Sequence, residues 1–338
     1  MPLFFLVLPI LISCNKDLNV NAEWKDITVV YGLLDQSEDT TFIKITKAFL
    51  GEGNALMFSK VPDSSTYPDV LDVNLEEYDN NGTTYITTHP CDGITIHDKV
   101  AGDTIFYYPN QFMYYCADKL HNDRVYKLKI RNKVSGKEIS AQTSLVSDFE
   151  VFRPNGTASF IPTKPFNVKW KSRSNGNGKR YQLVIRFIYQ EILKSDPNGP
   201  RVKKYIDWTL FNSIKTVDPT ISETFDKFYP GDLFYSVVGS RIMPNPLVDR
   251  VAYKCIYYFT VGAPELSTYM DITEPSLSLV QEKPAYTNIT NGIGLFSSRF
   301  MKQWPSRDTI NNTLDSLDIS QVTKDSLRVN VHTRNLGF

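Results

Sequence analysis

The sequence predicts a mainly β protein built from two β-sandwich domains, the second of which also contains short helices. Three observations support this prediction. Apolar and polar residues alternate over many short stretches, turns rich in Asn and Gly separate these stretches, and a proline-rich seam divides them into two groups. The chain has 338 residues, of which 41% are apolar and 22% charged, so it has enough apolar material for a buried core.

The first residues have the pattern of an export signal. Residues 4–12 are almost wholly apolar, a run far shorter than the about 20 residues of a membrane-spanning helix. The run ends in Leu11, Ile12, Ser13 and Cys14, and this sequence resembles the bacterial lipobox, where the cysteine receives a diacylglyceryl group. We therefore expect a lipoprotein signal peptide over 1–13 and lipidated Cys14 with a polar tether over 14–25. A plain secretory signal and a short buried segment are the alternatives.

Strand signals fill residues 26–147, the expected first domain. In residues 27–33, Ile, Val, Tyr and Leu alternate with smaller or polar residues, and the alternation is cleanest in 71–76. Asn80, Asn81 and Gly82 predict a tight hairpin with 83–88 as the return strand, because Asn and Gly accept positive φ. A last hairpin, 126–144, turns at Ser135 and Gly136. It resembles the end of an immunoglobulin-like or fibronectin type III-like module.

A seam at residues 148–165 contains three prolines and is the expected linker. Residues 166–338 then form the expected second domain, with strand patterns at 166–170, 181–192, 205–211 and 253–259. Apolar residues recur at helical spacing behind Asp232, which predicts a short helix with this residue as its N-cap. A second helical turn is expected at 266–270, and Cys255 is expected to face inward.

The charge balance argues against a dedicated nucleic-acid-binding protein. Lys and Arg number 37, and Asp and Glu number 37, so no global field attracts the chain to a polyanion. The cysteines are consistent with export. Without Cys14 there remain Cys91, Cys116 and Cys255, which allow one internal disulfide at most. Cys91 and Cys116 form the favoured pair because they fall in the same expected domain, and three buried thiols are the alternative.

Residues with metal-binding chemistry gather in one stretch, because His89, Cys91, His97, Cys116 and His121 fall within 33 residues. Their spacing matches no zinc motif, His89 precedes Pro90 in an expected turn, and a disulfide would remove both thiolates. No metal and no cofactor is therefore expected.

The sequence predicts no catalytic residue. The segment around Ser240 lacks the second glycine of a Gly-x-Ser-x-Gly elbow, and Cys255 has the context of a core residue. Glu76 and Glu77 are adjacent on a strand, so they face opposite ways and are expected to be solvated surface rather than an acid pair. The ligand-binding residues stay unknown at this level.

Aromatic residues make up 13% of the chain. Clusters at 106–108 and 112–115 are expected in loops or edge strands, where they would stack on sugars or line a protein interface. The alternative, that they fill the core and its rims, is favoured.

Two short segments carry a resemblance to a known family. These are Tyr-Thr-Asn-Ile-Thr-Asn-Gly-Ile-Gly-Leu-Phe at 286–296 and the closing Leu-Gly-Phe at 336–338. Together with the lipobox and the β-rich body, they resemble a family of uncharacterised Bacteroidota outer-membrane lipoproteins that is often encoded beside TonB-dependent transporters. The resemblance implies an accessory role in uptake or surface binding and no catalytic residues. Asn291, Gly292 and Gly294 also permit a tight turn before a strand at 293–298, so a structural role explains the motif equally well.

We therefore expect a non-enzymatic binding protein, anchored at the periplasmic or cell-surface face of the outer membrane through the acyl chains on Cys14. Its expected partner is a TonB-dependent transporter or a glycan. A surface adhesin or pilus-like subunit is the second hypothesis, and a hydrolase with an unrecognised site is the third. An adhesin requires exposed edge strands, a transporter accessory copurifies with its transporter, and a hydrolase requires converging carboxylates in a cleft.

Overall fold

The computed structural model of the chain describes residues 27–48, 66–67, 69–97, 110–273, 286–306 and 316–338. Within these residues the protein is mainly β and has three short helices. Cys14, with the rest of the expected signal peptide and tether, and the aromatic run at 106–108 lie outside them. No helix in the described part of the chain is long and apolar enough to cross a membrane.

The N-terminal half is a set of antiparallel strands with the order β1-β2-β5-β4-β3-β6-β7. Both predicted hairpin turns are confirmed, with Gly82 at φ +70° and Gly136 at φ +71°. These are conformations that glycine adopts without strain. The strands are β1 (Ile27–Asp35), β2 (Thr41–Ala48), β3 (Leu71–Tyr78), β4 (Tyr85–Ile96), β5 (Gln111–Cys116), β6 (Val125–Asn132) and β7 (Glu138–Ser144).

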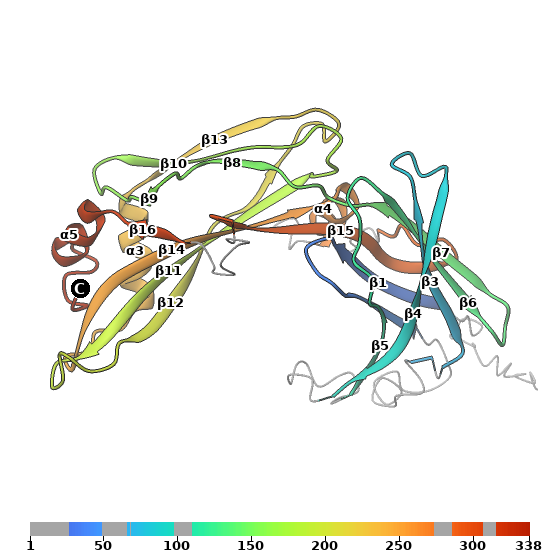
Figure 1. Ribbon diagram of the computed structural model, residues 1–338, viewed down its shortest axis with the longest axis horizontal. Coiled ribbons are helices and arrows are strands. Elements are labelled where there is room, and N and C mark those ends of the chain that lie inside the picture. Colours follow the sequence, from blue (N-terminus) through green and yellow to red (C-terminus); the bar gives the residue numbers. More distant parts are fainter. Residues whose placement is uncertain (1–26, 49–65, 68, 98–109, 274–285, 307–315) are drawn as a thin grey trace, which may run out of the picture.

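The C-terminal half contains the longest strands and the helices. A three-stranded sheet lies over the strands of the large sheet in this half (Figure 1). Aromatic side chains pack between the two sheets. The strands of this half are β8 (Glu150–Arg153), β9 (Thr157–Ala158), β10 (Pro165–Lys171), β11 (Arg180–Leu193), β12 (Val202–Lys215), β13 (Thr224–Pro230), β14 (Val248–Gly262), β15 (Gly292–Trp304) and β16 (Leu317–Ile319). The helices are α3 (Asp232–Arg241), α4 (Pro264–Thr273) and α5 (Gln321–Val329).

Strand β15 connects the two halves. Its residues 292–299 pair in parallel with β1, and residues 299–304 pair antiparallel with β14. In Figure 1 this strand runs from one half of the molecule to the other. Phe296 lies in the hydrophobic core of the N-terminal half, and Phe300 lies in that of the C-terminal half. The late part of the sequence therefore supplies a strand to the N-terminal half.

The core of the C-terminal half is aromatic. Trp170 of β10 is fully buried, stacks on Phe225 of β13 with ring centroids 4.8 Å apart, and contacts Phe259 of β14 at 5.9 Å. It therefore joins the three-stranded sheet to the large sheet. Cys255 of β14 is 0% exposed, as its inward position predicted.

The expected linker at 148–165 is part of the fold, because it contains β8 and β9. Phe149, Val151 and Phe160 are all buried in the core of the C-terminal half. Pro154 lies between β8 and β9, Pro162 lies between β9 and β10, and Pro165 begins β10.

The first strand lies where the alternation predicts it. Its buried side, however, is not the side that carries the alternating Ile, Val, Tyr and Leu residues. Val30 and Leu34 are fully buried, whereas Tyr31 is 43% exposed. Gly32 also faces inward, where a Cβ would lie 2.9 Å from the ring of Phe296. The close packing of β15 therefore decides which side of β1 is covered.

Both expected helices are present, as α3 and α4. Asp232 is the first residue of α3 and not its N-cap, which is Gly231. Helix α5 was not predicted. It begins after Ser320, whose side chain accepts a hydrogen bond from the Thr323 backbone N–H, and it buries Leu327 on one side.

Candidate functional site

The structure joins Cys91 of β4 to Cys116 of β5 by a disulfide, the pairing favoured from the sequence. The two strands are hydrogen-bonded neighbours, with Asp92 opposite Tyr115, so the register brings the two cysteines together. Both cysteines belong to the core of the N-terminal half. The disulfide therefore adds a covalent link between adjacent strands.

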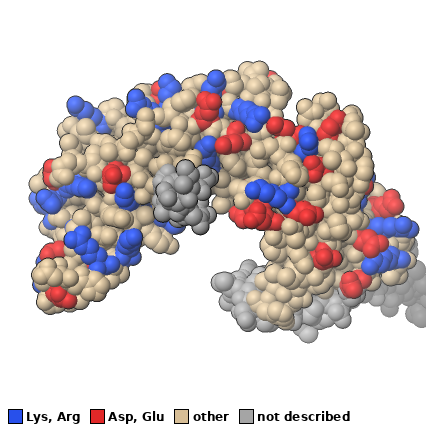
Figure 2. Space-filling model, viewed as in Figure 1, with Lys and Arg blue, Asp and Glu red and all other residues tan. Residues whose placement is uncertain are grey.

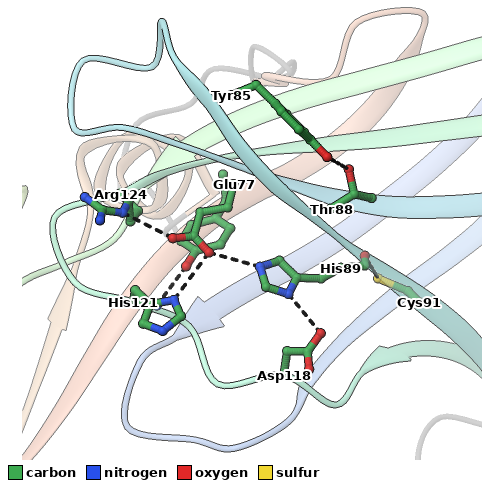
Figure 3. Close-up of polar contacts among 9 residues, drawn as sticks. Glu77, Tyr85, Thr88, His89, Cys91, Asp118, His121 and Arg124 are labelled. Carbon is green, nitrogen blue, oxygen red and sulfur yellow. Dashed lines mark hydrogen bonds and ion pairs between the residues drawn. The ribbon is translucent and has the colours of Figure 1, made fainter.

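A cluster of charged and imidazole side chains lies near this disulfide (Figure 3). We call it the Glu77 cluster. Glu77 of β3 accepts contacts from three side chains. Its Oε2 lies 3.0 Å from His89 Nε2 and 3.3 Å from His121 Nδ1, and its Oε1 accepts a hydrogen bond from Arg124 Nε at 3.2 Å. In the β3–β4 register, Leu75 is opposite His89, so Glu77 and His89 are diagonal neighbours on one face.

His89 is held between two carboxylates. Its Nδ1 lies 2.8 Å from Asp118 Oδ2, while its Nε2 contacts Glu77. Burial raises the pKa of Glu77, but hydrogen bonds from His89 and His121 outweigh this effect, and the pKa is lowered from its ordinary value. Glu77 is therefore an anion at neutral pH. Each ring nitrogen of His89 is therefore within hydrogen-bond distance of a carboxylate oxygen.

Two expectations for these residues are wrong. Glu77 is not solvated surface but 3% exposed, because β4 and the segment before β6 cover its side of β3. His89 lies within β4 and not in a turn. Among the metal-site candidates, His97 contacts Asn110 at 3.2 Å instead of joining the cluster. In the described part of the chain, no group of three or more His, Cys, Asp and Glu residues is arranged to hold a metal.

The Glu77 cluster has the character of a stabilising network. Its buried members are paired with one another, and neither Glu77 nor His89 lines either of two sizeable cavities elsewhere in the protein. Two candidate nucleophiles are also engaged in the fold. Ser240 donates to the Val237 carbonyl within α3, and burial raises the pKa of the Cys255 thiol well above its ordinary value.

The aromatic cluster at 112–115 lies in a central strand, since β5 is between β2 and β4. Its expected place in a loop or edge strand is wrong, and Tyr114 is a buried core residue. Exposed aromatics of this half include side chains on the outer face of β1 and β2. Tyr31 of β1 and Phe42 of β2 are each 43% exposed.

These aromatics line a cavity of about 560 Å³ that we call the Asp35 cavity. Its floor is the outer face of β1, β2 and β15, and α4 forms a wall. Across the strands, Tyr31 is opposite Lys44 and Leu295, and Asp35 is opposite Arg299. The lining includes both aromatic and charged side chains, among them Tyr31, Asp35, Glu38, Phe42, Lys44, Tyr269, Leu295 and Arg299.

The wall of the Asp35 cavity carries paired tyrosines. The ring of Tyr269 on α4 meets the ring of Tyr31 edge-on, with centroids 6.4 Å apart and planes at 75°. Burial, followed by a hydrogen bond with Tyr269, raises the pKa of Tyr31. The Tyr31 phenol is therefore neutral at neutral pH, and both tyrosines line the cavity.

The charged pair in this cavity is incompletely satisfied. Asp35 is 3% exposed, and its Oδ1 accepts hydrogen bonds from the backbone N–H and the hydroxyl of Ser37 at 3.0 and 2.5 Å. Its buried Oδ2 forms an ion pair with Arg299 Nε at 3.5 Å, and among the described residues neither of these two atoms has a partner with hydrogen-bond geometry. Buried polar atoms seldom remain in this state, because each unmade hydrogen bond costs free energy.

A larger cavity of about 700 Å³ lies between β8, β10 and β15. Two of the polar side chains in its lining are engaged within the fold. Lys302 lies 2.7 Å from Asp148 Oδ1, and Trp304 Nε1 donates to the Pro154 carbonyl at 2.9 Å. The Asp35 cavity differs because its lining combines the exposed rings of Tyr31 and Phe42 with an ion pair that lacks hydrogen-bond geometry. We therefore take it as the candidate binding site.

Asp35, Arg299 and Tyr269 were not predicted as site residues from the sequence. The only local signal was the outer series of β1, which ends in Asp35, and nothing in it pointed to β15 or α4. Over the face visible in Figure 2, Lys and Arg side chains are interspersed with Asp and Glu, in accord with the zero net charge. In comparisons with known proteins, no protein-family model and no curated protein gives a significant match to this chain.

Proposed function

We propose that this chain is a lipid-anchored, non-enzymatic binding protein that takes its ligand in the Asp35 cavity. The observation that carries the proposal is the Asp35–Arg299 pair. This ion pair lies in the lining of a cavity of about 560 Å³ that the exposed rings of Tyr31 and Phe42 also line. Small-molecule sites have this composition, with mostly apolar lining and a few convergent polar groups, and volumes of about 300–1,000 Å³.

The proposal also includes the anchor and the location. The lipobox-like run ending in Cys14 supports acylation, and the resemblance to Bacteroidota outer-membrane lipoproteins supports the outer membrane. By the same resemblance, the proposed partner is a TonB-dependent transporter. Binding rather than catalysis is favoured because Ser240, Cys255 and Glu77 are all engaged within the fold.

We further propose that the two halves are β-sandwich domains of immunoglobulin-like or fibronectin type III-like character. In the N-terminal half, the first part of β4 pairs with β3 and its last part pairs with β5, so this strand passes from one layer to another. In the C-terminal half, an aromatic core fills the space between two sheets. Strand β15 belongs to both of these proposed domains, because it pairs with β1 in one half and with β14 in the other.

The anchor is tested by membrane fractionation. Wild-type protein is expected in the membrane fraction and to incorporate a radiolabelled fatty acid, and Cys14→Ala is expected in the soluble fraction without the label. Cys255→Ala is the matched control and stays membrane-bound, because Cys255 lies in the core. A Cys14→Ala protein that remains in the membrane contradicts the anchor.

The partner is tested by affinity purification of tagged protein from mildly solubilised outer membranes, followed by mass spectrometry. A transporter recovered in stoichiometric amount supports the accessory role. Recovery of the lipoprotein alone contradicts that role and moves support to direct ligand binding at the surface or to adhesion.

A further inference from the structure

We infer that Asn155, in the turn between β8 and β9, is a site of spontaneous deamidation, at which the side-chain amide is converted to a carboxylate. This modification is separate from the proposed binding function and does not depend on it. The inference follows from the sequence Asn155-Gly156 and from the state of the two groups that have to react.

The reaction joins the backbone nitrogen of Gly156 to the side-chain carbon of Asn155. The N–Cγ bond forms and the Cγ–Nδ2 bond breaks, while the amide proton of Gly156 passes through solvent to the departing nitrogen, which leaves as ammonia. Water, the only co-reactant, then opens the succinimide ring at Cγ to give aspartate, or at the main-chain carbonyl carbon to give isoaspartate. Glycine in the second position favours the attack because it has no Cβ to obstruct it.

Neither reacting group at Asn155 is held by the fold. Its side chain is exposed and makes no hydrogen bond within the described residues, and the Gly156 backbone N–H makes none there either. The Thr157 backbone N–H donates to the Asn155 carbonyl at 3.1 Å, in a turn that does not use the Gly156 N–H. Gly156 has φ +81°, and apart from its chain neighbours no described atom lies within 4 Å of the place a Cβ would take. The succinimide ring therefore has room to form.

The chain has five other Asn-Gly steps, and a hydrogen bond holds one reacting group in each. In three of them the glycine N–H donates to the carbonyl of the residue three positions earlier, at 2.9–3.1 Å, and these glycines are Gly82, Gly176 and Gly199. In the other two the asparagine amide donates to a backbone carbonyl, from Asn177 Nδ2 at 2.7 Å and from Asn291 Nδ2 at 3.0 Å. Each of these hydrogen bonds has to break before the ring can form.

The surroundings of Asn155 favour the charged species of the reaction. Arg153, Lys169 and Lys171 line a cavity together with Asn155, and no described carboxylate does. Lys169 pairs with Asp226 at 3.4 Å, whereas Arg153 and Lys171 form no ion pair within the described residues. Nearby cations stabilise the negative charge that develops during the attack, and they also stabilise the carboxylate of the product. Deamidation therefore adds an anion beside unpaired cations.

The test is peptide mapping of purified, detergent-solubilised full-length protein. The folded protein is kept at mildly alkaline pH for several weeks, and mass spectrometry follows the exchange of ammonia for water at each Asn-Gly step. We expect Asn155 to deamidate about fivefold or more faster than each of the other five asparagines, because those sites must first break a hydrogen bond. Chromatography should separate its product into an aspartyl and an isoaspartyl peptide.

The same measurement in guanidinium chloride tests the role of the fold. Unfolding removes the hydrogen bonds at the other five steps, so their rates should rise to the rate at Asn155, which should itself change little. A preference for Asn155 that persists in the unfolded chain would contradict the inference, because local sequence would then select the site.

Asn155→Gln and Asn81→Gln are matched variants, since both asparagines are exposed and precede glycine. Glutamine keeps the amide but has to close a six-membered ring, which forms far more slowly. Release of ammonia from the folded protein should fall by about half or more in Asn155→Gln and by about a tenth or less in Asn81→Gln, as the expected rate ratio requires. The inference is overturned if both variants release ammonia at the same rate, or if Asn155 deamidates no faster than the other five asparagines in the folded protein.

Discussion

Gly294 lies directly opposite Val30 in the parallel pairing of β15 with β1. Its φ is +121°, and a Cβ built on it would lie 2.0 Å from the Val30 carbonyl oxygen. Both the backbone conformation and the close approach therefore require glycine. This contact lies where the late strand enters the N-terminal half, and it gives a physical reason for the Ile-Gly-Leu sequence at 293–295.

Gly294→Ala should destabilise the protein more than an alanine at another glycine with positive φ. Gly136 has φ +71°, and no described atom lies within 4 Å of the place a Cβ would take, so Gly136→Ala carries only the backbone cost of about 1–2 kcal/mol. The clash at Gly294 adds about 1–3 kcal/mol. Urea unfolding measures both variants. Equal losses would contradict the tight β1–β15 contact.

Glu77→Gln should lower the free energy of unfolding by about 1–3 kcal/mol at neutral pH, because the hydrogen bonds to a buried carboxylate are lost. Glu76→Gln is the matched control. Glu76 faces the other side of β3 and contacts the Tyr78 hydroxyl, so its replacement should cost less than about 0.5 kcal/mol. Chemical denaturation distinguishes the two. Similar losses would mean that the Glu77 cluster does not stabilise the fold.

The lowered pKa of Glu77 predicts that the free energy of unfolding depends on pH. Burial raises the pKa of Glu77, yet hydrogen bonds from His89 and His121 lower it overall from the ordinary value of 4.5. A lowered pKa means that the stabilisation is fully present above about pH 4.5 and is lost as the pH falls through the folded-state pKa. Unfolding curves between about pH 7 and pH 3 should therefore fall more steeply for wild type than for Glu77→Gln. Parallel pH profiles would contradict this role.

Reduction of the disulfide should destabilise the protein by about 3–4 kcal/mol, as chain entropy predicts for a loop of this size. Cys91 and Cys116 are separated by 25 positions. Unfolding with and without a reductant measures the effect, and Cys255→Ala should show the same difference between the two conditions. Thiol labelling under denaturing, non-reducing conditions is expected at Cys255 alone among these three cysteines. Labelling of both Cys91 and Cys116 would disprove the bond.

Arg250 ties the chain end to the large sheet. Its side chain is 3% exposed, contacts Glu191 Oε1 at 2.9–3.0 Å and donates to the Leu336 carbonyl, while its backbone N–H donates to the Gly337 carbonyl at 2.6 Å. Arg250→Met removes these contacts and leaves the buried Glu191 paired with Lys204 alone, at 2.5 Å, so we expect a loss of about 1.5–3 kcal/mol. The closing Leu-Gly-Phe sequence thus has a structural role.

The control for Arg250→Met is Asp249→Asn, which breaks an exposed pair with Lys194 at 3.6 Å. Its cost should be below about 1 kcal/mol. Thermal unfolding ranks the two variants, and carboxypeptidase digestion reports the order of the chain end. Arg250→Met should be trimmed faster than Asp249→Asn. Equal digestion rates would show that Arg250 does not hold the end.

Local pattern was sufficient for much of the secondary structure. Period-two alternation located β1, β3, β6, β10, β11 and β14, because a strand with one covered face needs that period whatever its partner. Gly82 and Gly136 marked hairpins because few other residues accept their φ values. Helix α5 escaped detection because it buries few apolar side chains, with Leu327 chief among them.

The sequence by itself determined that the chain is mainly β, where its main turns lie and which two cysteines could meet. It could not determine which face of a strand is covered, because alternation is the same for both faces. Only tertiary pairing turned Glu77 inward beside His89, and only the parallel pairing of β15 with β1 brought Arg299 to Asp35. The candidate site is a product of that long-range pairing, for which neither segment carries a local signal.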